Sequence, residues 1–236
     1  MRFVSLHGII VGLILSRFTK EKFGIPFDFV LEVLIGGIIF GVFGARIYYV
    51  LFNFKEYMHN PLKIWRITDG GLAIYGGIIA IVLYLVIYCR IRKQNFLDLA
   101  DYLVPYLALG QAFGRWGNFF NIEAYGRQTT GLFRMGIYEL GKYVEVHPCF
   151  LYESIGCFLI FLILTEVRKK RKYKGQVLYL YFTLYAFIRF FIERLRTDSL
   201  FLGYYRASQL LSLVLFSYFA ITVVEKLKNN KKDIEN

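Results

Sequence analysis

Long apolar segments alternate with short polar segments along almost the whole chain. A helix that spans a bilayer needs about 20 mostly apolar residues. On this basis we predict transmembrane segments at residues 3–16, 29–52, 71–89, 99–113, 149–167, 175–193 and 205–225. The pattern predicts an all-α polytopic membrane protein with about seven transmembrane helices, in which residues 1–236 form a single integral membrane domain.

The composition supports this prediction. Hydrophobic residues make up 57% of the chain, against about 45–50% in soluble domains. Aromatic residues reach 19%, which suits aromatic belts at the two membrane surfaces. A net charge of +12 is also typical of nucleic-acid binding proteins, but here the basic residues lie in short clusters between apolar segments. We therefore expect anionic lipid, and no nucleic acid, as the partner.

The basic clusters also predict the orientation. They follow the first, third, fifth and seventh segments, at residues 17–22, 90–93, 168–174 and 226–232. With seven spans these clusters share one side, which the positive-inside rule makes cytoplasmic. The N-terminus then lies outside and the C-terminus inside, and residues 114–148 form a small extracytoplasmic cap. Because only Arg2 precedes the first segment and no small-residue cleavage site follows it, we expect an uncleaved first helix rather than a signal peptide.

The stretch at residues 114–127, Gly-Arg-Trp-Gly-Asn-Phe-Phe-Asn-Ile-Glu-Ala-Tyr-Gly-Arg, is densely polar although its flanks are apolar. An intramembrane charge costs several kcal/mol unless it is paired, so such residues usually have a function. The glycines predict close backbone approach or an irregular turn, which at membrane depth must lie against protein or a polar cavity. We predict that this stretch forms the floor of a site for an anionic headgroup.

Other polar groups interrupt the apolar pattern. Residues 69–77, Asp-Gly-Gly-Leu-Ala-Ile-Tyr-Gly-Gly, place Tyr75 at a predicted helix start, where anions are favoured. Residues 147–153, His-Pro-Cys-Phe-Leu-Tyr-Glu, enter the fifth segment, and Arg46 lies within the second. Spacings of four, four and three residues put these four side chains on one helix face: Tyr185, Arg189, Glu193 and Arg196.

Each of these groups also has a purely structural interpretation. Arg189 and Glu193 have the spacing of an i,i+4 ion pair. Arg46 fits a snorkelling cation or the partner of a buried acid. His147 fits a cap for the fifth helix, and Tyr75 fits a packing residue between glycines.

The two arginines Arg115 and Arg189 suit a single phosphate, which they would hold through charge-assisted, bidentate hydrogen bonds. In the predicted topology both lie near the outer leaflet. Physical reasoning alone thus predicts a polytopic membrane protein with an outer-leaflet phosphate site.

The motifs go further, because together they resemble those of the bacterial prolipoprotein diacylglyceryl transferase family. They are Gly-Arg-Trp-Gly-Asn-Phe-Phe-Asn-x-Glu-x-x-Gly at 114–126, Asp-Gly-Gly-x-x-x-Tyr-Gly-Gly at 69–77, His-Pro-x-x-Leu-Tyr-Glu at 147–153, Tyr-x-x-x-Arg-x-x-x-Glu at 185–193, and residues 44–52 and 208–209. The matches keep their order over residues 44–212, and the first motif is specific.

The resemblance implies an activity. The family transfers the diacylglyceryl group of phosphatidylglycerol to the lipobox cysteine thiol of a preprolipoprotein in the bacterial cell membrane, which forms a thioether and releases glycerol phosphate. By this analogy Arg115 and Arg189 bind the phosphate and stabilise its charge. Glu193 and Tyr185 would orient Arg189, and Arg46 would support the polar network.

The same analogy assigns the remaining positions of the long polar stretch. The residues implied to order the headgroup are Asn118, Asn121 and Glu123. Gly117 and Gly126 would let the backbone approach it.

Two departures from the family pattern leave the base open. The family often has histidine, a proposed base for the thiol, where Tyr75 stands. With a reference pKa of about 10, a tyrosine is a poor base at neutral pH unless arginines lower its pKa, and it could instead hydrogen-bond the phosphate. His147, His7 and His59 are the other candidates. His7 stands where the family has a tyrosine near the start of the first helix, which indicates either replacement or a divergent paralogue.

No cofactor is expected. The leaving phosphate needs cations, which arginines supply, and the glycines do not form a P-loop. Cys89, Cys149 and Cys157 show no CxxC spacing, so we expect neither a metal site nor a disulfide. We expect a monomer. The alternatives are a catalytically inactive paralogue and a phospholipid-binding or transport protein, although transporters usually show repeated halves and none is visible here.

Overall fold

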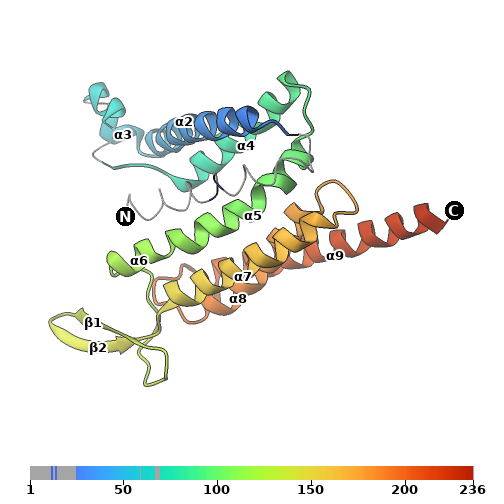
Figure 1. The fold of residues 1–236 in the computed structure, drawn as a ribbon. Coiled ribbons are helices and arrows are strands. Elements are labelled where there is room, and N and C mark those ends of the chain that lie inside the picture. The colour runs from blue at the N-terminus through green and yellow to red at the C-terminus, as the bar shows by residue number, and fades with distance from the viewer. Residues whose placement is uncertain (1–11, 13, 15–24, 59, 67–69, 236) are drawn as a thin grey trace. The chain divides into compact units, whose positions relative to one another are not determined.

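The computed structural model describes residues 12, 14, 25–58, 60–66 and 70–235 (Figure 1). Nearly all of the predicted first segment, together with His7 and His59, lies outside the described residues. The chain divides into two compact units, residues 23–99 and residues 1–22 with 100–236. Each unit is described by itself below.

The unit of residues 23–99 is built on two long helices, α2 (Phe27–Phe52) and α4 (Ile74–Ile91), which pack against each other. Between them lie the short helix α3 (Phe54–Tyr57) and the 3-10 helix η2 (Pro61–Trp65). Glycines bring the two backbones together. A Cβ added at Gly44 would lie 2.7 Å from the carbonyl oxygen of Gly76, and one at Gly76 would lie 2.4 Å from that of Gly44. Small residues permit this close packing of membrane helices.

This contact predicts a sharp difference between two alanine substitutions. In Gly76→Ala the new methyl group would meet Tyr48 Cβ at 2.2 Å, whereas one at Gly37 of α2 would meet nothing within 4 Å. We expect Gly76→Ala to lower the free energy of unfolding by about 1–3 kcal/mol, as overpacking does. The matched control Gly37→Ala should be neutral or slightly stabilising. Unfolding in mixed detergent, followed by circular dichroism, measures both; equal stabilities would contradict the close packing.

The unit of residues 100–236 contains most of α5 (Phe96–Gly114), the short helix α6 (Trp116–Phe120), and three long helices. These are α7 (Cys149–Lys169), α8 (Gln176–Glu193) and α9 (Ala207–Glu235). α8 packs against both α7 and α9 (Figure 1). Buried side chains of α5, α7 and α8 form a shared core: Val104, Ala108, Ile160, Leu164, Val177 and Tyr181.

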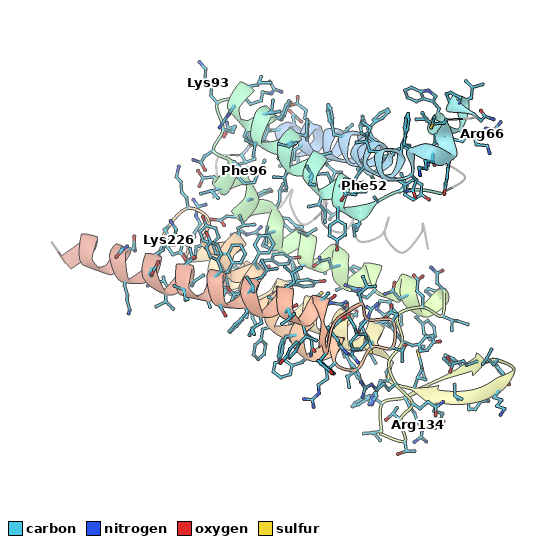
Figure 2. All side chains as sticks on the ribbon, turned by 180° about the vertical axis from the view of Figure 1, so that it is seen from behind. Phe52, Arg66, Lys93, Phe96, Arg134 and Lys226 are labelled. Atoms are coloured by element: carbon cyan, nitrogen blue, oxygen red, sulfur yellow. The ribbon has the colours of Figure 1, made fainter. Side chains whose placement is uncertain are left out.

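Two antiparallel hairpins complete this unit. The first pairs β1 (Met135–Glu139) with β2 (Lys142–Val146) and lies within the segment predicted as a cap. The second pairs β3 (Phe201–Leu202) with β4 (Tyr205–Arg206), between α8 and α9. Figure 2 shows Arg134, beside the first hairpin, and Lys226, near the end of α9, at opposite ends of the unit.

A buried carboxylate fixes the end of the unit that lies far from the first hairpin. Asp101 of α5 is fully buried. It accepts hydrogen bonds from the backbone N–H groups of Gly175 (2.7 Å) and Leu178 (2.9 Å) and forms an ion pair with Arg171 (3.1 Å). The acid within the fourth predicted segment is thus compensated by the start of α8 and the turn before it.

The predicted segments from 29–52 onward each correspond to a helix, so the mostly helical fold is confirmed. Within the described part of the chain, four helices are long and apolar enough to cross a membrane: α2, α4, α7 and residues Ala207–Asn230 of α9. α5 and α8 are helical but more polar. α9 also continues as a helix through the polar residues that follow the last predicted segment.

Candidate active site

The long polar stretch folds as a helix end, one short helix and a strained loop. α5 ends at Gly114, and after Arg115 the chain enters α6. In the loop that follows, Ile122 (φ 52°) and Ala124 (φ 57°) are left-handed. This conformation is rare for a β-branched residue and persists only where its surroundings impose it. The irregular turn that the sequence predicted is present, but it falls on these two residues and not on the glycines.

Gly126 is the point where this loop is fixed to the rest of the unit. Its N–H donates to the His147 carbonyl at 2.9 Å, and an added Cβ would lie 2.7 Å from His147 Cβ and 2.9 Å from Cys149 Sγ. The next residue, Arg127, donates its N–H to the Leu195 carbonyl at 2.9 Å. Only glycine fits between these neighbours, so the stretch is held between the start of α7 and the end of α8.

Trp116 sets the position of α6 on α7. Its indole Nε1 donates to Ser154 Oγ at 3.2 Å, and that hydroxyl donates to the Ala112 carbonyl at 2.8 Å. The indole ring also packs edge-on against Phe150 of α7. These contacts bring the neighbouring residue, Arg115, against Glu153.

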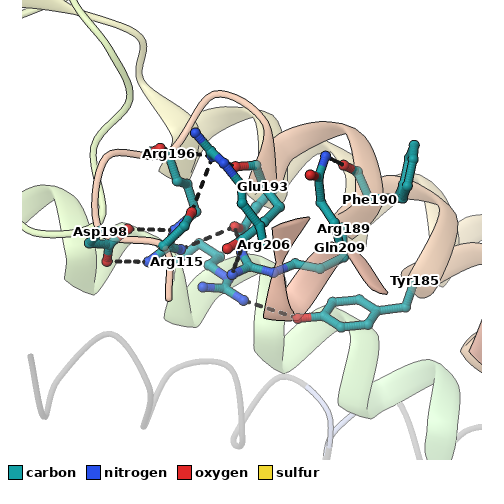
Figure 3. Close-up of polar contacts among 11 residues, drawn as sticks. Arg115, Tyr185, Arg189, Phe190, Glu193, Arg196, Asp198, Arg206 and Gln209 are labelled. Carbon is teal, nitrogen blue, oxygen red and sulfur yellow. Dashed lines mark hydrogen bonds and ion pairs between the residues drawn. The ribbon is translucent and has the colours of Figure 1, made fainter. Parts of the chain in front are cut away.

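Glu153 is the centre of the site, with 3% of its surface exposed. Its Oε2 lies 2.5 Å from Arg115 Nε, and its Oε1 pairs with Arg189 Nη1 and lies 3.5 Å from Arg196 Nη1. One buried carboxylate therefore holds three guanidinium groups from three separate segments, α5–α6, α8 and the turn after α8. We call Glu153 and these three arginines the arginine cluster; Figure 3 shows the polar contacts around it.

Two further acids compensate the cluster. Glu193 Oε2 pairs with Arg189 Nη2 at 2.6 Å, and Asp198 Oδ2 pairs with Arg196 Nη2 at 2.6 Å. The hydrogen bonds that Asp198 accepts from Arg196 hold the pKa of the Asp198 carboxyl below its usual value. Arg115 has a neutral partner as well, since its Nη2 donates to Tyr185 Oη at 3.1 Å. Three arginines and three carboxylates thus balance one another.

The structure brings four predicted site residues into direct or shared contact: Arg115, Tyr185, Arg189 and Glu193. The i,i+4 ion pair is present, but Arg189 also pairs with Glu153, so the ion pair is only part of its environment. Arg196 was expected on the same helix face. This expectation was wrong, because α8 ends at Glu193, yet Arg196 still reaches Glu153 from the turn that follows.

The other predicted residues of this unit lie in the strained loop or behind it. Asn121 Nδ2 donates to Glu123 Oε1 at 3.1 Å, and both residues are exposed. Asn118 accepts the Glu123 N–H at its carbonyl, at 3.0 Å. The cap before α7 is Pro148, without a side-chain hydrogen bond, and the His147 ring contacts Tyr152 instead, with Nδ1 at 3.2 Å from the hydroxyl.

Two predicted residues lie in the unit of residues 23–99. Arg46 is buried and does not snorkel, and within the part of the chain that the structure describes it forms no ion pair with an acid. It donates five hydrogen bonds of 2.6–3.1 Å to backbone carbonyls, those of Lys63, Ile64, Arg66, Gly70 and Gly71. Tyr75, the second residue of α4, has 65% of its surface exposed, so it is not a buried packing residue.

Sequence reasoning missed the central carboxylate and one supporting arginine. Glu153 is the last residue of the motif at 147–153. An acid at the start of an apolar segment was the signal that could have identified it as a site residue. Arg206, 7% exposed, donates to the carbonyls of Glu193 and Arg196 (3.0 Å for the second) and to Ser199 Oγ (3.1 Å). Nothing in its sequence surroundings indicated this role. Among the described residues, no group of three or more histidine, cysteine or acidic side chains could hold a metal ion.

Comparison with known proteins places this geometry in a family. A family model described as prolipoprotein diacylglyceryl transferase matches residues 3–224. A protein of Clostridioides difficile (strain 630) is 46% identical over 227 residues, which cover 96% of this chain and 90% of that protein. One of Finegoldia magna is 42% identical over 230 residues, covering 97% and 90%.

A protein of Clostridium novyi (strain NT) is 42% identical over 232 residues, which cover 95% of this chain and 90% of that protein. All three relatives are named phosphatidylglycerol–prolipoprotein diacylglyceryl transferase. The family match spans nearly the whole chain, including both the arginine cluster and the α2–α4 pair. The chain therefore belongs to the prolipoprotein diacylglyceryl transferase family.

Proposed function

We propose that this protein transfers the diacylglyceryl group of phosphatidylglycerol to the lipobox cysteine thiol of a preprolipoprotein, the first step of lipoprotein maturation. Membership of the family, with relatives of that name at 42–46% identity, supports the reaction. The observation that carries the site is the arginine cluster, in which Glu153 holds Arg115, Arg189 and Arg196 together.

The bond changes define what the site must do. The thiolate sulfur attacks the carbon of the diacylglyceryl group that is bonded to the phosphate oxygen. A C–S bond forms there as that C–O bond breaks. The electron pair leaves with the phosphate, and glycerol phosphate is released with more negative charge than it had in the diester. The thiol proton must pass to a base, because the thiolate is the nucleophile. Fixed cations near the leaving phosphate oxygens therefore lower the barrier.

Arg115 and Arg189 are the proposed cations. Arg115 gives Nε to Glu153 and Nη2 to Tyr185, and among the described residues its Nη1 has no partner. A phosphate can therefore bind without breaking the existing contacts. The carboxylates of Glu153 and Glu193 fix the direction of the guanidinium groups, so little reorganisation is needed when charge develops. Arg196 would belong to the same group.

Neighbouring residues have supporting roles in this proposal. Asn118, Asn121 and Glu123 would order the glycerol headgroup from the strained loop, with Gly126 fixing that loop in place. Arg46 would act indirectly, since it fixes the described residues 63–66 and 70–71 through their carbonyls. The base stays open between four groups: Tyr75, His147, His7 and His59.

We further propose a monomer with seven spans in the bacterial cell membrane, with the N-terminus outside, the C-terminus inside and residues 114–148 as an outer cap. The arginine cluster lies at one end of α7 and α8, and the basic residues 168–174 join their other ends. The helical rise from Glu153 to Lys169 is about 24 Å, which covers most of a hydrocarbon core about 30 Å thick. With the basic loop cytoplasmic, the cluster would face the outer leaflet.

A transfer assay tests this function. Purified protein is mixed with phosphatidylglycerol and a lipobox peptide, and peptide mass and released glycerol phosphate are followed. We expect one diacylglyceryl mass increment per peptide and an equal amount of glycerol phosphate. Headgroup binding without any mass increase would instead favour an inactive paralogue or a lipid-binding protein.

Substitution of Tyr75 separates its candidate roles. If the hydroxyl only assists the base or the phosphate, Tyr75→Phe should lower the transfer rate about 10–100-fold, in the range of general acid–base effects, whereas Tyr75→His should keep it. Initial rates across pH 6–9 are the measurement. Because the side chain is largely exposed, neither change should alter stability. An inactive histidine variant would show that the tyrosine hydroxyl has a role that imidazole cannot replace.

A further inference from the structure

A second group of arginines lies around the end of α8, and no acidic residue lines the cavity between them in the described part of the chain. A cavity of about 420 Å³ opens between the end of α8, the β3–β4 hairpin and the start of α9. Three arginines, five aromatic side chains and one glutamine line it, and no acidic residue does. The arginines are Arg127, Arg194 and Arg206.

The charge balance of this cavity differs from that of the arginine cluster. Each arginine of the cluster lies within 4.0 Å of a carboxylate. In the described part of the chain, none of Arg127, Arg194 and Arg206 forms an ion pair. Arg206 directs its Nη1 to the carbonyls of Glu193 and Arg196 and to Ser199, so its position is fixed while its charge stays uncompensated (Figure 3). Three uncompensated cations around one cavity favour an anion.

The helix geometry explains why the two sites are separate. Glu193 is buried and faces the arginine cluster, whereas the next residue, Arg194, is exposed and faces the cavity. Consecutive residues at a helix end do not face the same way. The Arg206 guanidinium also lies over the Phe201 ring, 5.4 Å from its centroid, which holds it at the cavity wall.

The aromatic residues that line the cavity and the exposed apolar side chains of α8 and α9 indicate the kind of anion. Tyr204 and Tyr205 are exposed at the cavity, as tyrosines at a membrane surface are. Beyond the cavity, α8 and α9 continue with exposed apolar side chains, among them Phe187, Leu213 and Val214. A ligand with a phosphate at the arginines and acyl chains along these helices would satisfy both surfaces.

We propose that this cavity is an accessory binding site for a glycerophosphate headgroup, separate from the arginine cluster. Arg127 and Arg194 bind the phosphate by charge-assisted hydrogen bonds, and Arg206 adds a fixed positive charge at the wall. The same chemistry is offered by an anionic membrane phospholipid and by free glycerol phosphate.

The test uses the full-length protein in phosphatidylcholine nanodiscs that contain phosphatidylglycerol with a photoreactive headgroup. Crosslinks are mapped by mass spectrometry of peptides. We expect labelling of residues 201–209, which line the cavity and lie outside the arginine cluster, and we expect Arg127→Ala/Arg194→Ala to reduce it about tenfold or more, since two charged hydrogen-bond donors are lost. The matched control, Arg134→Ala/Lys142→Ala, removes two positive charges from the neighbouring hairpin region and should keep the labelling.

Two arms separate this proposal from the transfer reaction and from its own alternatives. Arg115→Ala should leave the labelling of residues 201–209 unchanged even though it stops transfer. Suppression of labelling by excess free glycerol phosphate would identify the soluble phosphate as a ligand, and persistence would identify the lipid.

Equal labelling by photoreactive phosphatidylcholine, or labelling that survives loss of both arginines, would overturn the proposal. Should the double variant fail to fold, Arg194→Gln gives the same test at a single exposed residue. Its labelling should fall as well, and unchanged labelling would count against the site.

Discussion

Arg115→Ala and Arg189→Ala are each expected to lower the transfer rate at least about 10²–10³-fold, the range seen when one preorganised donor to a developing anion is removed. Both arginines are fixed by Glu153, and the leaving phosphate gains charge as the C–O bond breaks. Arg→Lys at either position should recover little activity, because an ammonium cannot reproduce the planar fork of donors. Initial rates with phosphatidylglycerol and a lipobox peptide are the measurement.

A surface arginine supplies the control. Arg134→Ala removes a cation that pairs with Glu145 at 2.9 Å near the hairpin, with about half of its side chain exposed. Its transfer rate should equal that of the unmodified protein, and all three variants should give the same circular dichroism spectrum. Normal lipoprotein modification by Arg115→Ala or Arg189→Ala would refute the assignment of the phosphate site.

Glu153→Gln is expected to have the largest effect on stability. The substitution keeps the shape of the side chain but leaves three partly buried guanidinium groups without their shared carboxylate. Loss of one partner from a buried ion pair costs about 3–5 kcal/mol. Because 12–22% of each arginine side chain remains exposed to solvent, we expect the loss in the free energy of unfolding to lie near the lower end of that range. Transfer should fall as well, because the guanidinium groups lose their common orientation.

Glu123→Gln is the matched control for this stability effect. Glu123 lies in the adjacent loop, is exposed, and receives only the Asn121 amide. Its loss should change the free energy of unfolding by less than about 1 kcal/mol, as expected for an exposed polar contact. Unfolding midpoints in mixed detergent compare the two variants. Equal midpoints would mean that contacts other than Glu153 hold the arginines in place.

The helices could be predicted because their signal is local. Apolar length alone gave α2, α4, α7 and α9, and it also gave α5, in which the polar Asp101 is compensated at a distance by residues 171–178. The predicted segment 175–193 ends where α8 ends, but the i+4, i+8 and i+11 spacing also suggested that Arg196 lies on the same helix, which stops at Glu193. Only the Glu153 contact shows that Arg196 still belongs to the cluster.

The details of the site depend on contacts that a sequence does not display. Ile122 and Ala124 adopt left-handed conformations that their residue types disfavour, so only the contacts that fix the surrounding loop could reveal them. Arg46 was open between a snorkelling cation and an acid partner, and five carbonyls from residues 63–71 proved to be its partners. Every residue has a backbone carbonyl, so the sequence does not show which carbonyls an arginine will bind. Arg206 could not be predicted for the same reason, because it also donates to backbone carbonyls.

The burial of Asp101 has a consequence for synthesis of the chain. The backbone donors that compensate its carboxylate begin at Gly175, 74 residues later in the sequence. At roughly 5–20 residues per second, the ribosome reaches them about 4–15 s after it has added Asp101. During that interval α5 carries an acid whose backbone partners do not yet exist, so the packing of α5 against α8 cannot be completed until the start of α8 has been made. This one contact therefore couples the final packing of α5 to translation of the second half of the protein.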